Sequence, residues 1–496
     1  MFHHPIPLSA ALLAVLLPVT AAAQQMTAKD AWDALRALAA DNGMAITAQG
    51  VSDFGTALEA RGVHIFPTDE PNAMVIGMAD LRVEPRGDMI ALIPSETITV
   101  DTLFAGGVTR GFEIHQAGEI RGNLTDDSAA LDLDFGTVSM RLVSSNRRGA
   151  PLAEAFDVDL TGFDGSLRAT RDGTAEVTLG FDGSRYDYSL PQGFPGSGGA
   201  VAASGATEAI RVTFSGAELD MLGGLEDTPG ALRAAFDAGF HAHFSMETEG
   251  GTGSSQQTIE GAPVSMTTQS GPSSMTLDIV DGRFDLDMTA DAAQFSGSYA
   301  GVAGSLGLDG MGVSIGGPLV VTPDLQPARY AFHLDNVTPS PELLALVNAG
   351  DFAGESLSLA LDIRADARLT RELGPDFGEG ATPPFDLDQL RLDQVLLQVG
   401  DSAFTGNGAA TLIGGMAAQI GRGMPNANGD FTFDLVGGQR LLDRLTALGL
   451  VPQDQLFFVR MMMNGLGQPV GEDHLRSEVA LRPGGQITVN GAPLPF

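Results

Sequence analysis

Two histidines separated by one residue, His241 and His243, are the strongest candidates for metal chemistry in this chain. They lie in a segment that alternates apolar and polar residues, and alternate side chains of a β-strand point to the same face. Two imidazoles at that spacing could bind one metal ion. Glu247 and Glu249 follow the same alternation as the histidines, so they could complete a mixed site. The other interpretation places both histidines on the hydrated face of a strand whose apolar residues fill the dry face. We favour the second interpretation, so no metal site is assigned.

The sequence also contains pairs of aspartates two residues apart, such as Asp132/Asp134, Asp157/Asp159 and Asp285/Asp287. None continues into the calcium-binding loop pattern, in which a glycine and a distal glutamate follow the aspartates. A glycosidase would need two carboxylates in a concave site, and the chain has only one Trp and four Tyr to stack on a sugar. We therefore expect the pairs on hydrated strand faces, where water screens their repulsion.

The chain shows few features of an enzyme. It has no cysteine, which excludes disulfides, zinc–thiolate sites and cysteine nucleophiles. No H-E-x-x-H motif, no phosphate-binding loop and no serine at a strand-to-helix elbow is recognisable. The single lysine, Lys29, has no catalytic setting. We expect no catalytic residue, no cofactor and no metal, and we keep a metal- or carboxylate-dependent envelope hydrolase as a second alternative.

The first residues predict export. An apolar run from Leu8 to Val19 is followed by the A-x-A pattern that ends at Ala23. A short apolar run before such a pattern is typical of a signal peptide, and it is shorter than the roughly 20 residues that span a bilayer. We predict a signal peptide at 1–23, cleavage after Ala23 and a periplasmic location. The absence of Lys and Arg before the run departs from the usual pattern, and an uncleaved anchor is the alternative.

The charge balance limits the partners. There are 62 acidic and 27 basic residues, for a formal net charge of −35. This charge repels nucleic acid and anionic lipid headgroups, so we expect no nucleic acid partner. Divalent cations or basic partners would be attracted, but acidic side chains on hydrated strand positions also keep a large β-protein soluble. We favour the role in solubility.

The elements that would position these residues are mostly strands. Residues Thr27 to Asn42 predict a helix, because Thr27 and Asp30 form a capping box and Trp32 belongs to an apolar face at helical spacing. From Met44 to about Leu190, short segments alternate apolar and polar residues and end at Gly, Asp-Gly or Pro. This pattern is typical of antiparallel strands with one dry and one hydrated face.

Composition suggests how the rest is organised. Residues 191–208 and 249–257 are rich in small and polar residues and predict loops or linkers. Helical inserts are expected at Ala217–Ala238, in two pieces, and at Pro341–Ala349 after Ser340 as N-cap. The predicted domains are an N-terminal helix plus β-rich region at 24–190 and a β-rich region with helical inserts at 209–496. One continuous domain from 24 to 496 is the alternative.

The C-terminal segment predicts a strand, two helices and a closing strand. Leu441, Leu445 and Leu448 form a helical stripe that ends at Gly449, and Pro452 begins a second helix. The second helix is apolar on most sides, so we expect it to be buried or to sit in a groove. The predicted fold class is therefore mainly β: long curved antiparallel sheets with an N-terminal helix and about three short helical inserts, including this C-terminal helical hairpin.

Two C-terminal stretches resemble the bacterial domain of unknown function 2125 family: NGDFTFDLVGGQRLLDRLTALGLVPQ and GGQITVNGAPL. The A-W-D-A-L helix and the acidic strands extend this resemblance over the mature chain. The closing Gly-x-Ile-x-Val-Asn-Gly strand is more distantly similar to AsmA-like and YdgA-like β-rich envelope proteins. The resemblance implies a periplasmic or envelope protein of Gram-negative bacteria with a long curved sheet, and it brings no catalytic residues.

Together these patterns favour a non-enzymatic, exported envelope protein that binds a hydrophobic ligand or lipid along a curved β-sheet. The strands carry Leu, Val, Ile, Phe and Met on one side, and few helices are available to cover them. The alternative is a structural or interaction module of the periplasm, in which two sheet layers close into a filled core and the partner is an envelope protein.

Overall fold

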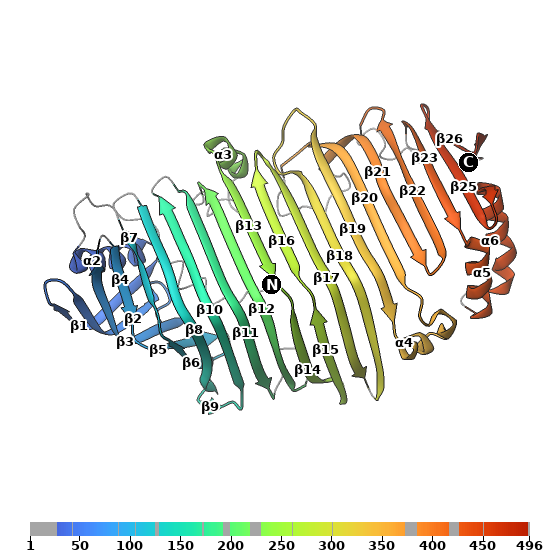
Figure 1. Cartoon of the computed structure of the whole chain (residues 1–496). Coiled ribbons are helices and arrows are strands. Elements are labelled where there is room, and N and C mark those ends of the chain that lie inside the picture. Colours follow the sequence, from blue (N-terminus) through green and yellow to red (C-terminus); the bar gives the residue numbers. More distant parts are fainter. Residues whose placement is uncertain are drawn as a thin grey trace. The chain divides into compact units, whose positions relative to one another are not determined.

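The computed structural model describes residues 27–494, apart from 42, 88, 105, 125–127, 171–172, 192–198, 219–229, 260, 300, 373–383, 416–425 and 450. The predicted signal peptide lies outside the described residues. The chain divides into two compact units: unit 1 contains Met1–Asp220 and Ala242–Thr267, and unit 2 contains Met221–His241 and Thr268–Phe496. Each unit is built mainly of long antiparallel strands (Figure 1), which confirms the predicted fold class.

Unit 1 begins with a helix and continues in strands. Its elements are α2 (Ala28–Asp41), β1 (Met44–Asp53), β2 (Leu58–Pro67), β3 (Met74–Arg86), β4 (Met89–Pro94), β5 (Thr97–Phe104), β6 (Val108–Gln116), β7 (Glu119–Leu124), β8 (Ser128–Arg147), β9 (Ala150–Pro151), β10 (Ala155–Thr170), β11 (Ala175–Leu190), β12 (Val201–Ala217), β13 (His241–Thr248) and β14 (Gly251–Ile259). Strand β15 (Ala262–Ser270) contains a division point between the units.

Helix α2 forms as predicted. The Thr27 amide donates to Asp30 Oδ2 at 3.2 Å, and the Asp30 amide donates to Thr27 Oγ1 at 3.1 Å, which confirms the capping box. Gly43 follows the helix with a φ of 70°, a left-handed conformation that glycine adopts without strain. The apolar side of α2, which includes Trp32, packs on the first strands of the unit (Figure 1).

The main core of unit 1 lies between α2 and the sheet. Trp32 is 4% exposed and is surrounded by buried residues from strands far apart in sequence. They come from β1, β2, β3, β4, β8 and β10: Ile46, Leu58, Ala60, Val63, Leu81, Val83, Ile90, Leu92, Ala129, Leu131, Leu167 and Ala169. The apolar face predicted for this helix is therefore confirmed, and Trp32 anchors it in the core.

The long strands β3 and β8 are connected by two short strand pairs, β4–β7 and β5–β6. Strand β3 pairs with β5 along its first half and with β4 along its second half. Strand β8 pairs with β7 first and then with β6. The pairs β4–β7 and β5–β6 therefore form two separate ladders between β3 and β8.

Gln116 lies where these two ladders part, and its side chain is buried. Its Nε2 donates to the carbonyl oxygens of Pro94 at 3.2 Å and Ser95 at 2.9 Å, and its Oε1 accepts from the Gly118 amide at 2.8 Å. One side chain thus joins the end of β4 to the residue before β7. A buried amide with three partners is favourable, whereas each partner left alone would be costly.

We predict that Gln116→Leu lowers the free energy of unfolding of unit 1 by about 1–3 kcal/mol, because two partly buried carbonyls and one amide lose their partner. Chemical denaturation followed by circular dichroism measures this difference. Exposed Gln49 on β1 provides a control, since Gln49→Leu breaks no such set of bonds and is expected to cost less than about 0.5 kcal/mol. Equal effects of the two substitutions would contradict the role assigned to Gln116.

Glycine bulges keep the apolar residues on one face of long strands. In β8 the apolar side chains occupy odd positions through Phe135 and even positions from Val138, and β10 shows the reverse change. Gly136 and Gly162 stand at the change with φ values of 58° and 63°, and the register of the two strands shifts there. A bulge adds one residue to the alternation, so both halves of each strand present their apolar side chains to the same side.

Glu154 forms a paired carboxylate beside β9. It accepts hydrogen bonds from Arg110 Nε at 2.8 Å and Ser145 Oγ at 2.7 Å. The hydrogen bond from Arg110 holds the pKa of Glu154 below its ordinary value. A depressed pKa in the folded protein contributes stability above the unfolded pKa of about 4.3, and that stability is lost as pH falls through the folded pKa.

Accordingly, Glu154→Gln is expected to lower the free energy of unfolding by about 1–2 kcal/mol at neutral pH, because a charge-assisted pair is lost. The difference from wild type should shrink as pH falls below the unfolded pKa of about 4.3 and then through the lower pKa of the native carboxylate. Denaturation curves measured from pH 7 to pH 3 test this. A difference that stays constant with pH would show that the charge of Glu154 is not the cause.

Unit 2 contains α3 (Ala231–Ala238), β16 (Ser273–Val280), β17 (Arg283–Tyr299), β18 (Val302–Pro318), β19 (Gln326–Pro339), α4 (Pro341–Leu346), η2 (Gly350–Phe352), β20 (Leu357–Leu369), β21 (Phe385–Val399), β22 (Ser402–Leu412), β23 (Ala427–Val436), α5 (Gly438–Ala447), α6 (Gln453–Leu466), β24 (Gln468–Gly471), β25 (His474–Arg482), β26 (Gln486–Val489) and β27 (Ala492–Pro493). Strands β16 to β23 pair in sequence order, and β25 follows β23.

The predicted loops at 191–208 and 249–257 are wrong for residues 201–208 and 251–257. The structure instead forms β12 and β14 there, and these two strands pair with each other in register. Residues 192–198 lie outside the described part. Glycine, serine and alanine have little preference for strands, but pairing with neighbouring strands outweighs that weak local preference.

The helical inserts agree with the sequence in position. Helix α3 is the second predicted piece of Ala217–Ala238, and the first piece falls in residues that the structure does not describe. Helix α4 begins at Pro341 after Ser340, as predicted. It ends before the predicted Ala349, and Asn348 adopts a left-handed φ of 55° that is incompatible with a continuing helix.

Candidate functional site

The strands of unit 2 place apolar side chains in rows across one face of the sheet. One row runs through Leu286, Ile315, Tyr330, Ile363 and Leu392, which are direct partners in five successive strands. Residues that face each other across a strand pair point to the same side of a sheet. The row is therefore a continuous apolar band perpendicular to the strands.

Two further rows lie beside the first, displaced by two residues along the strands, or by three residues across the bulge in β21. We call the three rows together the apolar face. The second row consists of Met288, Val313, Phe332, Leu361, Val395, Gly406 and Phe433. The third row consists of Met311, Leu334, Leu359, Leu397, Phe404, Leu435 and Leu475.

Several side chains of the apolar face reach solvent. Met288, Met311, Tyr330 and Leu397 are 41%, 40%, 48% and 44% exposed. Large apolar side chains in the interior of a domain are mostly buried, so partial exposure in adjacent rows marks a surface that can take up an apolar ligand. The predicted dry face is present, and these residues show that it is only partly covered.

Aromatic rings line the end of the apolar face on β22 and β23. The rings of Phe404 and Phe433 stack with centroids 5.7 Å apart, and those of Phe431 and Phe433 stack at 6.4 Å. Gly406 lies opposite Phe433, and a β-carbon at Gly406 would come within 2.2 Å of that ring. The glycine lets the ring lie flat on the neighbouring strand.

The opposite face of the same strands carries ion pairs. Arg329 pairs with Asp362 at 2.9 Å, and Arg364 on β20 pairs with Asp393 on β21 at 2.8 Å, where Arg391 also contributes. The hydrogen bond to Asp362 raises the pKa of Arg329. Exposed pairs of this kind add little stability, but they keep this face hydrated and leave the apolar face as the candidate site.

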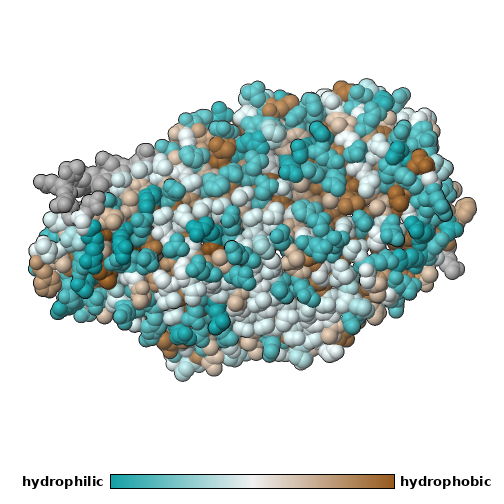
Figure 2. All heavy atoms as spheres, in the orientation of Figure 1, coloured by the Kyte–Doolittle hydropathy of each residue, from teal (hydrophilic) through white to brown (hydrophobic). Residues whose placement is uncertain are grey.

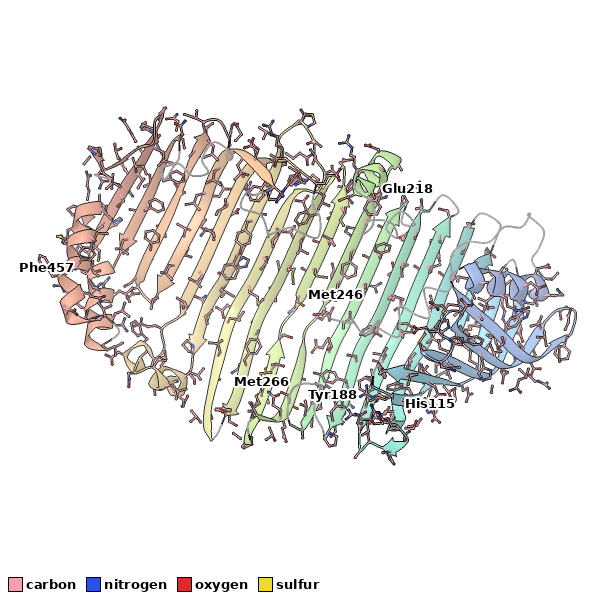
Figure 3. The ribbon with its side chains drawn as sticks, turned by 180° about the vertical axis from the view of Figure 1, so that it is seen from behind. His115, Tyr188, Glu218, Met246, Met266 and Phe457 are labelled. Atoms are coloured by element: carbon pink, nitrogen blue, oxygen red, sulfur yellow. The ribbon has the colours of Figure 1, made fainter. Side chains whose placement is uncertain are left out.

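The figures show both sides of the strands. In Figure 2, the side of unit 2 that faces the viewer mixes hydrophilic side chains with small hydrophobic patches. Figure 3, seen from behind, shows aromatic side chains along the strands of unit 2 and Phe457 projecting outward from α6.

The two candidate histidines lie on β13, in a strand as predicted. His241 is exposed, and its Nδ1 lies 3.1 Å from the Gly239 carbonyl oxygen. Across the described residues, no three His, Cys, Asp or Glu side chains form a group that could hold a metal ion. The structure thus gathers no further ligands around His241 and His243.

Five of the six aspartates named above bind arginine or hydroxyl groups. Asp132 pairs with Arg168, and Asp157 and Asp159 both pair with Arg141. In unit 2, Asp285 pairs with Arg283 and Asp287 accepts from Ser314. These carboxylates belong to strand faces with positive or polar neighbours, which does not resemble a pair of catalytic acids.

We compared the chain with known protein families, curated proteins and solved structures. No family model, no curated protein and no solved structure matches this chain. The resemblance proposed from the sequence therefore stays a prediction. None of the helices in the described part is long and apolar enough to cross a membrane.

Residues Gly312 to Gly316 match the letters of G-x-S-x-G, the nucleophile elbow of many hydrolases, in which the serine stands on a sharp turn between strand and helix. Here the whole run lies within strand β18, and the Ser314 hydroxyl donates to Asp287. A serine within an extended strand lacks the sharp turn that presents the nucleophile of the elbow, so we assign the motif no catalytic role.

Proposed function

We propose that this chain is a non-enzymatic, exported envelope protein that binds a hydrophobic ligand, such as the acyl chain of a lipid, along the apolar face of unit 2. The observation that carries the proposal is the set of three apolar rows, in which Met288, Met311, Tyr330 and Leu397 remain partly exposed. The apolar run before Ala23 supports export to the periplasm.

The dimensions of the apolar face fit an acyl chain. The longest row runs from Met311 on β18 to Leu475 on β25 and crosses seven strands. Strands are spaced by about 4.8 Å, so the row is roughly 29 Å long. Its last two residues, Leu435 and Leu475, lie against Gly438 of α5 and Gly467 after α6, so the part from Met311 to Phe404, about 19 Å long, remains for a ligand. One acyl chain spans about half of a hydrocarbon core of about 30 Å. The face is therefore long enough for a complete chain.

The chemistry of the face also favours an acyl chain over an extended peptide. The backbone groups of a central strand are already paired with both neighbouring strands, so the face offers side chains alone. A peptide lying on it would leave its own amides and carbonyls without partners, which is costly away from water. A hydrocarbon chain has no such groups to satisfy and gains from removal of apolar surface from water.

Extraction of the purified mature protein with organic solvent, followed by lipid mass spectrometry, tests the proposal. We expect lipids to co-purify and delipidated protein to bind a fluorescent fatty acid. Protein that is consistently empty and does not bind the fatty acid would rule the proposal out. In that case the periplasmic interaction module, detected by crosslinking in cells, becomes the better account.

A further inference from the structure

Helix α6 presents an apolar stripe to solvent. Phe457, Phe458, Met461 and Met462 are 77%, 56%, 52% and 46% exposed. Their spacing of one, four and five residues places them on one side of the helix. Figure 3 shows Phe457 directed away from the rest of unit 2. The expectation that this helix is buried or sits in a groove is therefore wrong for these residues.

The other side of α6 is fixed to unit 2. The Met463 side chain reaches Gly438 on α5, where Leu435 of the apolar face also lies. The Leu466 carbonyl accepts from Ser477 Oγ and from Asn490 Nδ2. These contacts hold the helix in one orientation and keep the stripe on its outer side. The sequence could not show this, because it does not tell which side of an apolar helix meets the sheet.

The size of the stripe decides between two occupants. A large aromatic side chain buries about 150–250 Å², so the exposed parts of two Phe and two Met amount to roughly 400–500 Å². A stable dimer needs about 800 Å² from each partner, whereas a functional patch on a monomer is about 300–600 Å². A second copy of the chain is thus disfavoured, and shallow insertion of a few side chains into a lipid surface fits.

The charges identify the kind of lipid surface. Arg460 is the only basic residue of α6, and it is paired with Asp443 on α5. The stripe itself carries no charge, and the whole chain has a net charge of −35. Anionic headgroups would be repelled, while zwitterionic headgroups would not. Phenylalanine and methionine suit insertion at the boundary between headgroups and acyl chains.

We propose that α6 docks this protein on a zwitterionic lipid surface by inserting Phe457, Phe458, Met461 and Met462. The stripe lies apart from the ligand rows of the apolar face, so this interaction is independent of the proposed function. Either one can fail in experiment while the other holds.

Co-sedimentation of the full chain with phosphatidylcholine vesicles tests the docking surface. Wild type is expected to bind, and the double variant Phe457→Ser and Phe458→Ser is expected to lose at least tenfold in vesicle partitioning with an unchanged circular dichroism spectrum. Phe54 of unit 1, which is 63% exposed, supplies the matched control. Phe54→Ser should bind as wild type does, and vesicles containing phosphatidylglycerol should bind less at low salt.

Three results would overturn the proposal. The first is wild type that does not sediment with phosphatidylcholine vesicles, and the second is a double variant that binds them as wild type does. The third is a wild-type protein that sediments as a dimer while the double variant sediments as a monomer. That result would show that the stripe binds a second copy of the chain. If the double variant misfolds, Met461→Gln takes its place, and we expect this variant to lose at least threefold in vesicle partitioning.

Discussion

Replacing Leu397 with glutamate is expected to weaken the binding of a fluorescent fatty acid at least tenfold. Leu397 is flanked by Leu359 and Phe404 in the longest apolar row and is 44% exposed. A carboxylate there would have to lose its hydration against a hydrocarbon chain, or keep its water and displace the chain. A tenfold loss corresponds to about 1.4 kcal/mol, well within the cost of such burial.

The control for this substitution is Gln394→Glu on the same strand. Gln394 is exposed and lies opposite Asp362, on the ion-paired face. Both variants add one negative charge to β21, so a general electrostatic effect would change both equally. We expect normal fatty-acid binding by Gln394→Glu and similar thermal unfolding of the two proteins. If both variants bind as wild type does, the ligand is not on the apolar face.

The largest effect on stability is expected from Trp32→Ala, with a loss of about 3–5 kcal/mol in the unfolding of unit 1. The indole belongs to the buried cluster that α2 shares with six strands of the unit, and it is almost completely buried. Removing it leaves a cavity that these strands cannot fill without breaking their ladders. Because Trp32 is the only tryptophan, unfolding has to be followed by circular dichroism rather than by its fluorescence.

Two control substitutions accompany Trp32→Ala. Trp32→Phe retains most of the apolar volume and should cost clearly less than Trp32→Ala. Phe54→Ala removes a ring that is 63% exposed and should change the free energy of unfolding by less than about 1 kcal/mol. A Trp32→Ala protein as stable as wild type would show that α2 is only loosely attached to the sheet.

Local signals in the sequence were sufficient where one side chain determines one local conformation. The capping box of Thr27 and Asp30, the proline that begins α4 and the alternation of the acidic strands all form as predicted. In each case the controlling atoms lie within a few residues of one another, so no knowledge of the tertiary structure is needed.

Other features depend on partners far away in sequence. Strands β12 and β14 consist largely of small residues and form through pairing with each other, which no local pattern reveals. The apolar face is similar: alternation predicts a dry side for each strand, but the register that aligns Leu361 with Val395 comes from bulges in the ladder. The exposure of Phe457 likewise depends on which side of α6 contacts β25.

Photo-crosslinking with a diazirine fatty acid, followed by peptide mass spectrometry of the delipidated and reloaded protein, tests the central claim most directly. We predict covalent adducts on exposed side chains of the apolar face, above all Met288, Met311, Tyr330 and Leu397. Absence of adducts, or adducts confined to residues of the ion-paired face such as Gln394, would contradict the assignment of the apolar face as a ligand site.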